Sequence, residues 1–209
     1  MEKENLMEKQ TTNKRCLLFG LETRELEIDG EEKKELWVEG RAVSFNSPTV
    51  LFEIGETQYK EQIDSRAFEE TNLSDVIFNY NGGKVLARTR NKTLVVDVRE
   101  DGVYIRARLD GTEEGRKLYD EIKGGYIDRM SFQFTIREQS YDKENHMWTV
   151  RKVKRLYDVS AVDIPAYDDT SIEARKNSIL EADAQEQSER KAAAELSKRK
   201  LQLKMKLSM

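Results

Sequence analysis

Between residues 103 and 109, apolar residues take every second position of the chain, and charged or aromatic residues take the positions between them. This period of two indicates a half-buried β-strand. The largely apolar residues 94–98 precede it, and the intervening Glu100-Asp101-Gly102 is typical of a tight turn between paired strands. We therefore expect residues 94–109 to form a β-hairpin.

Similar patterns predict further paired strands. One hairpin joins residues 26–28 to 36–38 through Asp29-Gly30, and another joins 130–136 to 148–157 through the polar residues 141–145. Residues 158–164 are expected to form one more strand, which Pro165 ends because proline lacks the amide hydrogen of a sheet ladder. Between residues 78 and 94 the pattern predicts a strand, a Gly82-Gly83 turn and a basic strand.

Two short helices are expected between these strands. The first covers residues 65–70. The second covers 111–123, where Asp110 is the expected N-cap, Glu113 fits a capping box and Gly124-Gly125 ends the helix. Many short strands with few helices predict a mainly β (α+β) fold, closed or nearly closed into a β-barrel.

Composition divides the chain into three parts. Residues 1–15 are polar, which predicts disorder. Residues 16–176 contain nearly all of the aromatic residues, and we expect them to form the β-barrel domain. Residues 177–209 contain no glycine, proline or aromatic residue and are rich in strong helix formers, which predicts a helical tail.

The tail is basic and the rest of the chain is acidic. Residues 190–209 carry seven basic residues and one acidic residue, whereas the remainder carries 29 basic and 39 acidic residues. A solvated helix is the ordinary interpretation of such a tail. Docking on an acidic partner or on nucleic acid is the alternative. The net charge of −4 argues against a chain that binds nucleic acid as a whole.

Cysteine and histidine are too few for several classes of site. A single cysteine, Cys16, cannot form an intrachain disulfide, and with one histidine it cannot complete a four-ligand zinc site, so we expect no metal or other cofactor. No apolar run is long enough to span a membrane. The first 15 residues also lack the apolar stretch of a signal peptide, and we expect an intracellular soluble chain.

Two polar side chains on predicted strands are candidates for chemistry. Alternation places Met130 and Phe132 in the core and Ser131 on the opposite side. A surface serine is the ordinary interpretation, because serine needs an adjacent base to become a useful nucleophile. Asp158 precedes the apolar Val159 and stands where an acid could orient such a base. A solvent-facing carboxylate is its ordinary interpretation.

In their order and spacing, these segments resemble the prohead (capsid maturation) protease family of tailed phages. The most specific stretches are Leu86-Ala87-Arg88-Thr89, Asp128-x-Met130-Ser131-Phe132 and Asp158-Val159-Ser160, within a resemblance covering about residues 36–175. The resemblance implies a herpesvirus-protease-like β-barrel and a serine endopeptidase. It implies that Ser131 is the nucleophile and Asp158 the third triad member. It also implies capsid and scaffold proteins as substrates, cleaved inside the procapsid in the bacterial host cytoplasm.

The family's histidine has no counterpart where the resemblance expects it. Tyr80-Asn81-Gly82 occupies that loop, so either the loop is one residue short or the histidine is replaced. Lys84 would be a substitute base if burial or a cationic neighbour lowered its pKa. His146, the only histidine, lies in a polar hairpin tip, and it would serve only if the hairpin folded back onto Ser131.

The missing histidine leaves three function hypotheses. The first is a serine protease of procapsid maturation. The second is a catalytically inactive pseudoprotease that acts as a capsid assembly or scaffold-binding module. The third, and weakest, is nucleic-acid binding through the basic tail. Capsid and scaffold proteins are the expected partners, with no membrane partner, and self-association into a homo-oligomer is left open.

Overall fold

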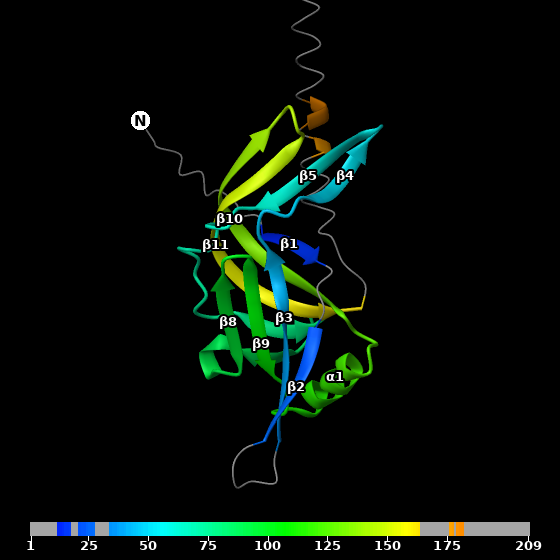
Figure 1. The fold of residues 1–209 in the computed structure, drawn as a ribbon, viewed down its shortest axis with the longest axis vertical. Coiled ribbons are helices and arrows are strands. Elements are labelled where there is room, and N and C mark those ends of the chain that lie inside the picture. Colours follow the sequence, from blue (N-terminus) through cyan, green and yellow to red (C-terminus); the bar gives the residue numbers. More distant parts are fainter. Residues whose placement is uncertain (1–11, 18–20, 28–33, 164–175, 178, 182–209) are drawn as a thin grey trace, which may run out of the picture. The chain divides into compact units, whose positions relative to one another are not determined.

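The computed structural model describes residues 12–17, 21–27, 34–163, 176–177 and 179–181. The chain divides into two compact units, residues 1–168 and 169–209. In the first unit the described strands pair into two sheets (Figure 1). The predicted mainly β fold is therefore confirmed. Its strands pair in two separate sheets and do not form one continuous hydrogen-bonded barrel.

The larger sheet is built around one long hairpin. Its strands lie in the order β1 (Thr12–Leu17), β10 (Arg129–Asp142), β11 (Met147–Val162), β5 (Thr57–Ile63) and β4 (Thr49–Ile54). β6 (Ile77–Tyr80) pairs with β11 and with β7 (Val85–Arg88). The separate strand predicted at 158–164 is wrong, because residues 158–162 continue β11 without a break.

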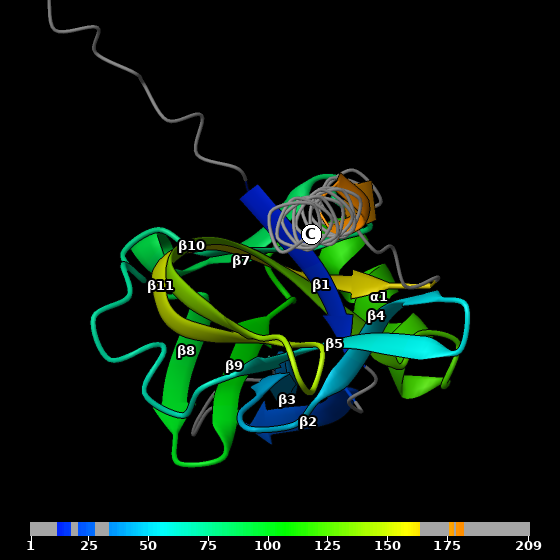
Figure 2. The ribbon, with the colours of Figure 1, turned by 90° about the horizontal axis from the view of Figure 1, so that it is seen from above.

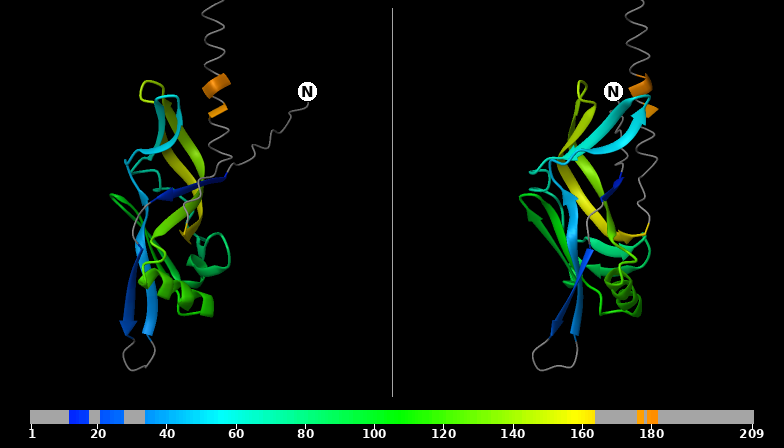
Figure 3. Two further views of the ribbon diagram at one scale, coloured as in Figure 1. Left: turned by 90° about the vertical axis from the view of Figure 1, so that its right-hand side faces the viewer. Right: turned by 45° about the vertical axis from the view of Figure 1, so that its right-hand side comes forward.

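β11 is antiparallel to β10 but parallel to two other strands. Residues 147–150 of β11 pair with β5, and residues 158–161 pair with β6. Figure 3 shows the β10–β11 hairpin and the β4–β5 hairpin together at one end of the sheet. The other end of β11 lies beside β6 and carries the residues discussed below.

The smaller sheet is antiparallel throughout. It contains β2 (Leu21–Glu27), β3 (Lys34–Ser44), β9 (Gly102–Arg108) and β8 (Leu94–Arg99), in that order. The predicted pairings of β2 with β3, β8 with β9 and β10 with β11 are confirmed. The predicted turn at Asp29-Gly30 lies outside the described residues.

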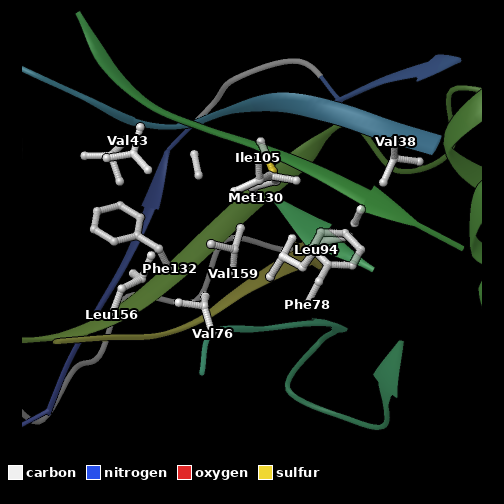
Figure 4. Close-up of a cluster of buried hydrophobic side chains, with 14 of the residues drawn as sticks. Val38, Val43, Val76, Phe78, Leu94, Ile105, Met130, Phe132, Leu156 and Val159 are labelled. Atoms are coloured by element: carbon white, nitrogen blue, oxygen red, sulfur yellow. The ribbon is translucent and has the colours of Figure 1, made fainter. Parts of the chain in front are cut away.

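The apolar core fills the space between the two sheets. Figure 4 shows Val38 and Ile105 of the smaller sheet facing Met130, Phe132 and Val159 of the larger one. Each of these side chains is at most 1% exposed. Burying such side chains contributes roughly 1.5–3 kcal/mol each. The alternation seen in the sequence thus corresponds to one buried face on each sheet.

Helix α1 (Glu113–Lys123) begins two residues later than predicted. Thr112, not Asp110, is its N-cap, and its Oγ1 accepts a hydrogen bond from the amide of Gly115 at 3.0 Å. Asp110 lies instead 3.4 Å from Nε of Arg108. The predicted end is confirmed, because Gly124 is the C-cap and Gly125 has φ of +75°.

The helix predicted at residues 65–70 is a series of turns. Three amides in this segment donate to the carbonyl three residues earlier, namely those of Ala67, Glu69 and Thr71. The segment buries Ala67 and Phe68, and the amide of Val153 donates to the Ala67 carbonyl at 2.8 Å. These contacts hold the backbone on the sheet and prevent a regular helix.

Replacing Thr112 with alanine is expected to lower the free energy of unfolding by about 1 kcal/mol, because the first turn of α1 loses its side-chain acceptor. Urea denaturation followed by tryptophan fluorescence would measure the change. Thr112→Ser keeps the hydroxyl and is the control. Equal losses in both variants would contradict the capping role.

The ends of the chain are described only in part. β1 begins at Thr12, although composition predicts that residues 1–15 are disordered. The strand forms because the edge of β10 supplies its hydrogen-bond partners, and composition alone does not reveal such a partner. Residues 1–11 lie outside the described residues, as do the basic residues of the predicted tail. Residues 176–177 and 179–181 are helical. The boundary at residue 176 stays a prediction. No helix in the described segments is long and apolar enough to cross a membrane.

Candidate active site

Ser131 lies in the middle of the larger sheet and is completely buried. The register places it opposite Cys16 of β1 on one side and Ser160 of β11 on the other. Its side chain is 0% exposed. Its Oγ has no hydrogen-bond partner within the described part of the chain. Since a buried polar atom without a partner costs free energy, Ser131 is unlike an ordinary surface serine.

A row of polar side chains crosses three strands at Ser131. Ser160 pairs with Ser131 of β10 and also with Asn79 of β6, so the three residues share one face of the sheet. Their neighbours Phe132 and Val159 fill the core on the other face. Asn79 is 1% exposed and Ser160 is 0% exposed. Local sequence patterns did not indicate Asn79, because the parallel pairing of β6 with β11 cannot be seen in them.

Asp158 lies on the same face, beside this row. It pairs with Gln133, so Ser131 is its diagonal neighbour across two strands, with Cα atoms roughly 7–8 Å apart. The hydroxyl of Ser160 donates to Oδ1 of Asp158 at 3.3 Å. The carboxylate is buried, with 9% of the residue exposed. The fold therefore brings Ser131 and Asp158 to adjacent strands, and Ser160 of the row bonds to the carboxylate.

The loop expected to hold a histidine is a complete turn. Asn81 and Gly82 have φ of 51° and 73°, and the amide of Gly83 donates to the carbonyl of Tyr80 at 2.9 Å. Positive φ at both central residues is the mark of a type I′ turn, for which Asn-Gly is the favoured pair. The amide of Gly82 also donates to Oδ1 of Asn79 at 2.7 Å. Tyr80-Asn81-Gly82 therefore forms a closed turn at the place where the resemblance expects a histidine.

Tyr80 is a poor proton acceptor in this environment. Its hydroxyl donates to Oδ2 of Asp163 at 3.4 Å. Burial, followed by the nearby carboxylates of Asp163 and Glu121, raises the pKa of Tyr80 above its ordinary value of about 10. The phenol therefore stays protonated at neutral pH and cannot take a proton from a serine.

Lys84 lies in solvent and is paired elsewhere. Its Nζ bonds to Oε1 of Glu114 in the first turn of α1, and its side chain is 65% exposed. The bond to Lys84 is the main reason that the pKa of Glu114 is lowered. A lysine base needs a dehydrated site or a cationic neighbour, and this position provides an anionic neighbour in water. The structure does not bring Lys84 to Ser131.

His146 lies at the tip of the β10–β11 hairpin. From Ser131 to the tip, β10 extends over a strand length of roughly 35 Å. Nδ1 of His146 is 3.4 Å from the Tyr141 hydroxyl, and its ring centroid is 4.9 Å from that of Tyr59. Pairing of Met147 with Lys60 of β5 holds the tip against a neighbouring hairpin. The hairpin therefore does not fold back onto Ser131.

The basic strand predicted before residue 94 ends early. β7 stops at Arg88, and a 3-10 helix, η1 (Thr89–Asn91), follows, so Arg90 and Lys92 do not continue its alternation. Arg88 and Arg90 both bond to Asp75, at 2.6 and 3.2 Å. The predicted basic strand is therefore only partly formed, and two of its arginines bond to the carboxylate of Asp75. No group of three or more metal-ligating side chains occurs in the described residues.

Comparison with known proteins agrees with the resemblance in the sequence. A family model described as caudovirus prohead serine protease matches residues 20–185 of the chain. A solved structure of the bacteriophage T4 capsid assembly protease, gp21, is similar with 18% identity and a TM-score of 0.44, covering 72% of this chain and 98% of that chain. None of the curated proteins compared with the chain matches it.

Proposed function

Because the chain belongs to the caudovirus prohead serine protease family, we propose that it cleaves peptide bonds of capsid or scaffold proteins during procapsid maturation. Ser131 is the nucleophile and Asp158 is the acid that orients a base. The observation that carries this proposal is the buried Ser131 hydroxyl, which has no hydrogen-bond partner among the described residues. The strand next to it carries the bonded pair Ser160 and Asp158.

In this mechanism, Oγ of Ser131 attacks the carbonyl carbon of the scissile bond and the hydroxyl proton moves to a base. The amine leaving group then takes a proton, and water hydrolyses the acyl-enzyme. The chain has one histidine, and it lies at the far end of β10. We therefore expect slow turnover, because an incomplete triad retains only roughly 10³–10⁴-fold acceleration over water.

Procapsid maturation sets where this reaction would take place. The proposal places the protein inside the assembling procapsid in the cytoplasm of the bacterial host, in contact with capsid and scaffold proteins. Membership of the prohead protease family supports this location.

A pseudoprotease is the second candidate, and one observation favours it. His146 is bonded to Tyr141 at the hairpin tip, so Ser131 has no imidazole near it. A chain of this kind would bind capsid or scaffold protein through the same fold without cutting it.

A cleavage assay against capsid and scaffold proteins from the same phage separates the two candidates. We expect cleavage by the chain to be abolished in Ser131→Ala and reduced less than about 10-fold in Asp158→Asn, because triad members act as a unit and the histidine that Asp158 would orient is absent. Ser140→Ala is the matched control, since Ser140 is an exposed serine of the same strand.

Each outcome of this assay has a definite meaning. Cleavage that persists in Ser131→Ala rules out Ser131 as the nucleophile. Binding of the substrate proteins without cleavage, equal in all variants, supports the pseudoprotease. Loss of cleavage in Ser140→Ala as well would show that the assay follows folding rather than chemistry.

A further inference from the structure

The stretch of β10 that carries Ser131 is paired on both of its edges. β10 pairs with β11 on one side, and β1 closes the other side from Met130 to Thr135 (Figures 2 and 3). Ser131 lies inside this covered stretch, opposite Cys16. An extended peptide that approached Ser131 from this side would meet the backbone of the chain itself.

Burial of the nucleophile shows that this arrangement is a closed one. A serine that is 0% exposed cannot touch a carbonyl carbon of another protein, so the residues around it must move before attack. β11 is held by β10, β5 and β6 together. β1 is the last strand in the order of the larger sheet and pairs there with β10 alone.

β1 is also a weakly attached element. It is six residues long, and its sequence Thr-Asn-Lys-Arg-Cys-Leu is mostly polar. A short polar edge strand gains its stability from a few ladder hydrogen bonds, each of which contributes only about 0.5–1.5 kcal/mol net. A peptide of matching length that pairs with β10 would recover the same bonds, so exchange is energetically balanced.

We propose that the edge of β10 from Met130 to Thr135 is the docking site for an extended peptide segment of the substrate, and that β1 occupies this site as an internal cover. The substrate segment replaces β1 as an antiparallel strand, which brings its backbone alongside Ser131. No covalent step is needed for the exchange. The inference rests on the proposed protease function and adds how the substrate reaches its site.

Proline substitutions in β1 test the proposal in the full chain. Neighbouring amides of an edge strand point alternately toward the partner strand and away from it. Of Lys14→Pro and Arg15→Pro, one therefore removes an amide that faces β10 and the other removes one that does not. Lys9→Pro, outside the strand, is the control. A fluorescent peptide of residues 11–18 is the probe, and anisotropy measures its binding.

We expect one of the two β1 variants to bind the peptide at least tenfold more tightly than the unmodified chain and Lys9→Pro do. Hydrogen exchange of the amides of residues 130–135 should accelerate in the same variant. Equal peptide binding by all four proteins, or unchanged exchange in both β1 variants, would overturn the proposal. Urea denaturation followed by tryptophan fluorescence identifies a variant that has lost its fold. Hydrogen exchange of residues 130–135 in the other variant then decides whether β1 covers this edge.

Neither readout requires catalysis, so the two proposals can fail separately. If the opened edge binds the peptide but the chain never cleaves a protein, the docking site is supported and the protease function is ruled out. If the chain cleaves at the same rate whether or not β1 is disrupted, the protease function is supported and the role of β1 as an internal cover is ruled out.

Discussion

Replacing Asn79 with histidine is expected to increase labelling of Ser131 by a serine-directed phosphonate about 100-fold or more, the usual contribution of a positioned general base. Position 79 lies in the polar row, on the same face of the sheet as Ser160 and Ser131. Asn81 and Gly82 are exposed turn residues with positive φ and cannot direct a side chain as a strand residue does. Asp158, which lies on the same face beside the row, would stabilise the imidazolium.

The pH dependence of labelling checks the mechanism of this gain. Labelling of Asn79→His should fall below about pH 6.5, where imidazole becomes protonated, and a neighbouring carboxylate shifts the fall to higher pH. Asn79→Gln is the control, because it keeps an uncharged amide without adding a base and should leave labelling unchanged. An Asn79→His chain no more reactive than Asn79→Gln would show that position 79 does not serve Ser131.

Gly102→Ala is expected to destabilise the fold by about 3 kcal/mol, at the upper end of the usual cost of overpacking. A Cβ at this position would lie 2.1 Å from the Val43 carbonyl oxygen and 3.0 Å from Cδ of Arg41. The first contact is with backbone, so no side-chain rotation relieves it. β9 would have to move away from β3, which carries the buried Val43.

Gly111→Ala is the matched control for this prediction. A Cβ at Gly111 would meet nothing within 4 Å, and removing a glycine there restricts the unfolded chain. Urea denaturation followed by the fluorescence of Trp37 and Trp148 would compare the two variants. Similar stabilities would mean that β3 and β9 separate at little cost.

Local sequence patterns predicted most of the strands and the antiparallel hairpins. Each hairpin joins segments that are close along the chain, and its turn residues lie between alternating strands. The helix at residues 111–123 was predicted with Asp110 as its cap, whereas Thr112 is the cap in the structure. Both residue types cap helices, and only the backbone geometry at Thr112 distinguishes them.

The assembly of the site could not be predicted from the sequence. The resemblance identified Ser131 and Asp158, but the residues around them depend on the parallel pairing of β6 with β11. Asn79 is a strand asparagine with no local signal, and it enters the row only through this pairing. Burial was also missed, because alternation assigns Ser131 to the face away from the core and does not show that this face is covered as well.

The order of strands also determines when the protein can acquire its site during synthesis. The smaller sheet is complete once Arg108 has left the ribosome, because β2, β3, β8 and β9 all precede it. The row at Ser131 needs β6, β10 and the far end of β11, which finishes at Val162. Long-range pairings of this kind form late. A nascent chain therefore does not assemble this row until its β-domain is almost fully translated, so any cleavage that depends on Ser131 would begin only after that point.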